Sequence, residues 1–203
     1  MTVDIDDHGI ERHGAGVWSV TYHKLYLPGW APIQSVAAGD AVPIRLGDGG
    51  VLLALSDCCF KNPSGMDDLP AHVFPDERLS DDPLDWTRRL AAMAGRTGLI
   101  TCPYYRRSGA KSLDPVPDID CLLFVRTADP RRPDKLRLID PATMGGDPGL
   151  KVVRVAVTID RRPMTRQVDR FLPWANDGWF ARHHMCTSRR GEHPVCSGSL
   201  RWG

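Results

Sequence analysis

The sequence contains no long hydrophobic run. Its longest uninterrupted apolar stretches, such as 51–55 and 121–125, have five residues, whereas a membrane-spanning helix needs ~20. The first residues are acidic and polar, without the basic stretch and apolar core of a secretory signal. We therefore expect a chain that does not span a membrane and that works in the cytoplasm or elsewhere inside the cell.

Glutamate and lysine are also scarce. Only three of the 25 acidic residues are Glu and five of the 26 basic residues are Lys, the rest being Asp and Arg. Glu and Lys favour helices, whereas Asp favours caps and turns. Together with 19 Gly and 17 Pro, this composition predicts many turns and short strands. It argues against a parallel α/β sheet, which would need several helices.

Several catalytic signatures are missing. The chain has no phosphate-binding loop, no dinucleotide-binding glycine fingerprint and no nucleophile elbow. Nucleotide-driven chemistry and elbow-type hydrolysis therefore have no support in the sequence.

Two apolar runs, 42–46 and 51–55, flank the turn residues Gly47-Asp48-Gly49-Gly50, a pattern typical of a β-hairpin. Further strands are expected at 17–27, 99–102, 120–127, 135–139 and 151–159. In the last of these, alternate residues from Val153 to Ile159 are expected to share one face.

One helix is predicted over 83–94. Asp82 is a suitable N-cap, and Pro83 suits the first helical position. Trp86, Leu90 and Met93 recur at helical spacing and predict one buried face.

These patterns predict a mainly β or α+β protein: a β-barrel or sandwich of short strands with one amphipathic helix (83–94) and a small C-terminal metal-knuckle tail. Residues 1–14 are polar and are expected to form a mobile N-terminal arm. Residues 15–160 would form the β-rich body, and residues 161–203 a basic, aromatic-rich C-terminal segment.

The tail holds a candidate metal site. His183, Cys186, His193 and Cys196 form two His-x-x-Cys pairs around a six-residue linker. Pairs at this spacing recur in zinc sites, and mixed imidazole and thiolate ligands suit a tetrahedral ion. His184 is an alternative to His183 as the first ligand. A Cys186–Cys196 disulfide, or two unpaired thiols, is the alternative to metal binding.

Four protein ligands leave no open position on the ion, which predicts structural rather than catalytic zinc. Such an ion would stabilise a tail that lacks a core of its own. An iron–sulfur cluster is disfavoured because most such clusters use four thiolates.

Positive charge is concentrated near the C-terminus. Residues 150–203 contain ten Lys and Arg against four Asp and Glu, whereas residues 1–149 carry a net charge of −5. Arginine and tryptophan often anchor binding surfaces. The candidate binding residues are Arg182, Arg189, Arg190, Arg201, Trp179 and Trp202.

The sequence therefore favours a non-enzymatic binding or assembly module with a zinc-clamped basic C-terminal segment. A protein partner or a larger assembly, such as a virion, is the expected partner, and nucleic acid is the alternative for the same basic residues. The competing hypothesis is an enzyme that uses Cys58 or Cys59 as a nucleophile, or the C-terminal His/Cys cluster as a catalytic zinc site.

Overall fold

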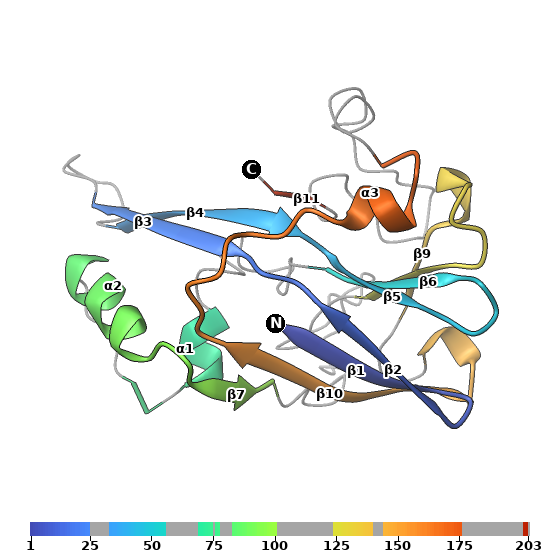
Figure 1. Cartoon of the computed structure of the whole chain (residues 1–203), viewed down its shortest axis with the longest axis horizontal. Helices are drawn as coiled ribbons and strands as arrows, with labels where there is room; N and C mark the ends of the chain where they lie inside the picture. The colour runs from blue at the N-terminus through green and yellow to red at the C-terminus, as the bar shows by residue number, and fades with distance from the viewer. Residues whose placement is uncertain are drawn as a thin grey trace, which may run out of the picture.

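The computed structural model describes residues 1–24, 33–55, 69–74, 76–77, 83–100, 124–139, 144–175 and 201–202. These residues form three antiparallel sheets with a few short helices around them (Figure 1). The strands are β1 (Thr2–Asp7), β2 (Ile10–Ala15), β3 (Ser19–Lys24), β4 (Ile33–Asp40), β5 (Val42–Arg45), β6 (Val51–Ala54), β7 (Thr97–Leu99), β8 (Phe124–Thr127), β9 (Arg137–Ile139), β10 (Leu150–Thr158) and β11 (Arg201–Trp202). The helices are α1 (Leu69–Val73), α2 (Pro83–Ala92) and α3 (Val168–Phe171), with 3₁₀ turns at η1 (Pro133–Lys135) and η2 (Met144–Gly146).

The mainly β class expected from the sequence is confirmed, and α2 is the only one of the described helices longer than five residues. In the described part of the chain, no helix has the length and apolar character needed to cross a membrane.

The first sheet, which we call the N-terminal sheet, has the strand order β2-β1-β10-β7. Its residues 2–15 form a hairpin, so the expected mobile N-terminal arm is wrong. Val3 and Ile5 are fully buried on one face of β1, and Asp4 and Asp6 alternate with them on the opposite face. The turn at His8-Gly9 places both residues at positive φ. β1 then pairs with β10, from Thr2 opposite Ala156 to Asp7 opposite Leu150.

The second sheet, the middle sheet, has the order β5-β6-β8-β9. It contains the predicted hairpin, with Val42 opposite Ala54 and Arg45 opposite Val51. Inside the turn, the Gly50 N–H donates to the Asp48 carboxylate at 2.8 Å. The strand expected at 120–127 corresponds to β8 in its described part, and that expected at 135–139 corresponds to β9.

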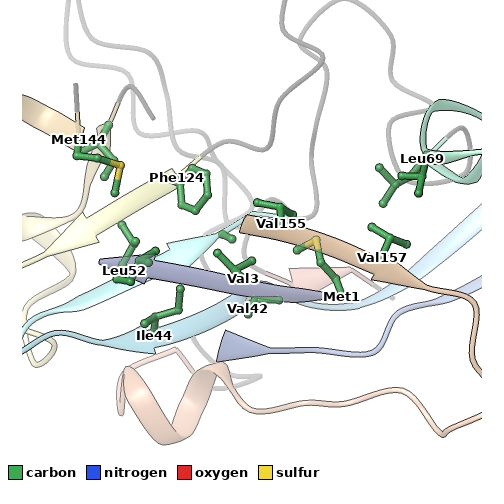
Figure 2. Close-up of a cluster of buried hydrophobic side chains, with 14 of the residues drawn as sticks. Met1, Val3, Val42, Ile44, Leu52, Leu69, Phe124, Met144, Val155 and Val157 are labelled. Atoms are coloured by element: carbon green, nitrogen blue, oxygen red, sulfur yellow. The ribbon is translucent and has the colours of Figure 1, made fainter. Parts of the chain in front are cut away.

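The middle sheet is buried on both faces, which explains why all four residues of β6 are apolar and buried. One face contributes Ile44, Leu52 and Phe124 to a core shared with Val3 of the N-terminal sheet (Figure 2). The opposite face packs against α3 and the residues after it. That second core consists of Ala41, Val51, Leu53, Leu55, Val125, Val168, Leu172 and Ala175.

The two larger sheets meet where β2 lies against β5. Gly14 on β2 makes this approach close: a Cβ at that position would lie 2.9 Å from the Pro43 carbonyl oxygen. Any side chain there would force β2 and β5 apart, because real Cβ atoms almost never come so near a backbone oxygen.

The small third sheet has the order β11-β4-β3. β3 and β4 form an antiparallel pair, and β3 lies within the strand predicted at 17–27. β11 returns from the far end of the sequence to pair with β4, with Arg201 opposite Asp40 and Trp202 opposite Gly39.

The helix predicted over 83–94 is confirmed as α2, and Gly95 follows it at a φ of 88°. Trp86 and Met93 are buried as expected, but Leu90 is only half-buried. The strand expected at 99–102 begins earlier, as β7, and residues 101–102 lie outside the described residues.

Strand β10 matches the strand predicted at 151–159, but its expected alternation fails at one residue. The pairing with β1 shifts between Asp4, opposite Arg154, and Ile5, opposite Val152. Val153 is therefore the extra residue of a β-bulge and is 60% exposed. Val155 and Val157 remain buried on the core side. Because of this one extra residue, the residues beyond the bulge point to the opposite face of the sheet from the face that a regular alternation would give them.

Candidate functional site

A cavity of about 300 Å³ lies between the two helices α1 and α2, the start of β3 and the C-terminal end of β10. This volume is at the lower end of the range of small-molecule sites, ~300–1,000 Å³. The wall is mostly apolar. Its residues are Met1, Val17, Trp18, Val20, Leu69, Pro70, Thr87, Leu90, Ala91, Ala94, Val157, Thr158, Ile159, Asp160, Arg161 and Arg162.

The space beside α2 is open because the side chains on the pocket side of this helix are smaller than those on its buried side. Trp86 and Met93 fill the core side. The pocket side carries Thr87, Leu90 and Ala91, at positions i, i+3 and i+4 of the helix, and Ala94 in the turn that follows it. Apart from Leu90, this stripe is made of small side chains that remain exposed.

Trp18 forms part of the pocket wall in a fixed orientation. Its indole Nε1–H donates to the Asp40 carbonyl oxygen at 2.6 Å. The ring lies over Gly39, whose φ is 149° and where any Cβ would overlap the indole. Glycine at 39 therefore allows the indole to lie against β4.

The mouth of the pocket carries charge at its β10 end. Asp160 accepts hydrogen bonds from the N–H groups of Arg161, at 2.7 Å, and Arg162, at 3.0 Å. Its carboxylate also pairs with the Arg162 guanidinium. The hydrogen bond from the Arg162 side chain is the main cause of the lowered pKa of Asp160.

Arg161 differs from its neighbour. Its side chain is exposed, and no residue in the described part of the chain forms an ion pair with it. Among the described residues, Asp160 compensates Arg162, and none compensates the positive charge of Arg161 at the mouth of this apolar pocket.

A second cluster of polar groups lies on the outer face of the β1–β2 hairpin. Asp4, Glu11 and His13 hold three ligand atoms within 4.8 Å of one another, the arrangement of a candidate metal site. Asp4 is buried, and both its oxygens already accept hydrogen bonds: from His13 Nδ1 at 3.1 Å and from Arg154 Nε at 2.7 Å. Burial raises the pKa of Asp4, but these hydrogen bonds outweigh it and leave the pKa below its usual value. We interpret the cluster as an ion network that supports the hairpin beside the bulge.

The predicted metal ligands His183, Cys186, His193 and Cys196 lie outside the described residues. The same holds for His184, for the alternative nucleophiles Cys58 and Cys59, and for Arg182, Arg189, Arg190 and Trp179. The described residues that come before and after the predicted metal ligands in the chain belong to the β-rich body. Ala175 is fully buried in the second core, and Arg201 and Trp202 form β11.

Sequence reasoning missed the pocket, because its wall comes from segments far apart in the chain. The one local signal is the stripe of small residues on α2. Comparison with protein-family models, with curated proteins and with solved structures gives no match to this chain.

Proposed function

We propose that the protein is a non-enzymatic binding or assembly module. In this proposal, the C-terminal segment, residues 161–203, carries a zinc-clamped knuckle on a sandwich-like β body. The knuckle presents Arg182, Arg189, Arg190 and Arg201, with Trp179 and Trp202, to a protein partner or a larger assembly.

The observation that carries this proposal is the pairing of β11 with β4. Asp40 pairs with Arg201 through the backbone, while its carboxylate accepts the N–H of Val168 at the start of α3. The start of α3 and Arg201 of β11 therefore both lie on the body beside Asp40. A segment closed at both ends has less chain entropy to lose, which favours a compact metal-bound turn.

Charge supports the choice of an anionic or acidic partner. The segment from residue 150 onward is the basic part of the sequence. Basic side chains held on a folded turn bind an acidic surface with less ordering cost than the same side chains on a free tail.

The test is elemental analysis of the purified full chain together with thiol titration. The proposal predicts about one zinc per chain, with the thiols of Cys186 and Cys196 protected. The double variant His193→Ala/Cys196→Ala should lose the metal and melt at a lower temperature. The double variant His8→Ala/Cys102→Ala removes the same residue types elsewhere and should keep the zinc. A wild-type chain with no metal, whose melting temperature matches that of His193→Ala/Cys196→Ala, would rule out the clamp.

A further inference from the structure

We propose that the pocket beside α2 binds a small organic acid, with its apolar part between α2 and the end of β10 and its anionic group at Arg161. This site does not include the predicted zinc ligands and does not depend on the proposed zinc clamp.

The first support is the shape of the wall. The cavity is lined by buried apolar side chains, among them Leu69 and Val157, on its inner side. On its outer side the small residues of α2 leave it open to solvent. Its volume of about 300 Å³ is that of about ten water molecules at ~30 Å³ each in the liquid. Such a site suits a small ligand that covers the exposed apolar wall.

The second support is rigidity. Trp18 is held by its hydrogen bond to the Asp40 carbonyl oxygen and by its position over Gly39. The other end of the wall is fixed where Gly95 N–H donates to the Ile159 carbonyl oxygen at 2.8 Å and Ile159 N–H donates to the Arg96 carbonyl oxygen at 3.0 Å. A preformed wall lowers the ordering cost of binding.

The third support is charge, which selects an anion over a neutral or cationic ligand. The charged groups of the wall residues are the N-terminal ammonium of Met1, which donates to the Gly16 carbonyl oxygen, and the side chains of Asp160, Arg161 and Arg162. Asp160 is neutralised by Arg162 and by two backbone N–H groups. Among the described residues, Arg161 is the side-chain cation of the wall that has no ion-pair partner, and guanidinium groups bind carboxylates through paired N–H donors.

The binding test uses sodium decanoate as the probe, with isothermal titration calorimetry on the full chain at low ionic strength. Decanol and decyltrimethylammonium serve as neutral and cationic probes of the same chain length. We expect saturable binding of about one decanoate per chain, binding of decanol about twofold to fivefold weaker, and no binding of the cation. Failure of decanoate to bind, or equal binding of decanoate and decanol, would overturn the proposal.

Matched substitutions on α2 locate the site. Ala91→Phe fills the pocket and should abolish binding, whereas Ala92→Phe adds the same ring at an exposed position outside the wall and should leave the affinity within about twofold. Thr87→Phe is a second filling variant if Ala91→Phe fails to fold. Equal decanoate affinities in the filling variants and in Ala92→Phe would place binding elsewhere and contradict the proposal.

Two further variants separate the parts of the proposal. Arg161→Glu should weaken decanoate binding by more than about fivefold, because it reverses the charge at the mouth. His193→Ala/Cys196→Ala should leave decanoate affinity unchanged, so a failed zinc clamp and a failed pocket give different results. An Arg161→Glu chain that binds decanoate as tightly as the wild type would refute the role of Arg161.

Discussion

The carboxylate of Asp40, at the end of β4, accepts the backbone N–H of Val168 at 3.0 Å, at the start of α3. The same oxygen accepts the N–H of Gln167 at 2.6 Å. Residues more than 120 positions apart in the chain are thus joined by one buried side chain, which ties the start of α3 to the end of β4.

Replacing Asp40 with Ala should lower the free energy of unfolding by about 1–3 kcal/mol, because two N–H groups lose their acceptor inside the protein. Urea denaturation of the full chain measures the change. Asp76→Ala, at an exposed turn position, is the control and should lie within about 0.5 kcal/mol of the wild type. If the two variants were equally stable, the hydrogen bonds from Gln167 and Val168 to Asp40 would contribute nothing to the stability of the fold.

A second prediction concerns pH and the contacts of Arg126. Its guanidinium donates to Asp48 at 2.9 Å and to Asp147 at 3.0 Å, which joins the β5–β6 turn to the loop before β10. Burial raises the pKa of Asp48, but hydrogen bonds from Gly50 N–H and Arg126 outweigh it and leave the pKa lowered. The hydrogen bond from Arg126 is the main cause of the lowered pKa of Asp147.

Both carboxyl groups therefore stabilise the folded state when ionised. This contribution is fully present above their ordinary pKa near 4 and is lost as the pH falls through their lower folded-state values. Arg126→Gln should melt below the wild type at pH 7, and the gap should close as the pH falls below the ordinary carboxyl pKa of about 4. Thermal denaturation across pH measures it. Arg131→Gln, at an exposed position, should melt like the wild type at every pH, and a gap for Arg126→Gln that stays constant with pH would refute the explanation.

The bulge in β10 gives a third prediction. Val153→Ala should change the free energy of unfolding by less than about 0.5 kcal/mol, because Val153 faces solvent. Val155→Ala, two residues later, should cost about 1.5–3 kcal/mol, because Val155 is buried. Chemical denaturation of the two variants compares them directly. An equal loss in both would mean that the strand alternates regularly and has no bulge.

The parts of the fold that the sequence predicted correctly are those with local causes. The hairpin at 42–55 has its own turn residues, and the helix at 83–94 has its own N-cap, proline and terminal glycine. Both were recognisable because neighbouring residues determine them.

The errors have causes in distant contacts. Residues 1–14 read as a polar arm because Asp4 and Asp6 occupy the outer face of β1, yet Val3 and Ile5 are buried once β10 lies alongside. Val153 was expected to share a face with Val155, because only the register with β1 reveals the extra residue. The pocket depends on the packing of α2 against β3 and β10, which no local pattern encodes.

The position of β1 between β2 and β10 has a consequence for how the chain folds. Thr2 pairs with Ala156, so the N-terminal sheet cannot be completed during synthesis until the chain has been made beyond β10. Until then the β1–β2 hairpin, whose apolar face carries Val3 and Ile5, has no partner strand along the edge of β1 that later pairs with β10. Contacts between residues so distant in sequence slow folding and prolong the exposure of this edge. Although β1 comes before β10 by more than 140 residues in the chain, it is thus among the last strands of the N-terminal sheet to be covered.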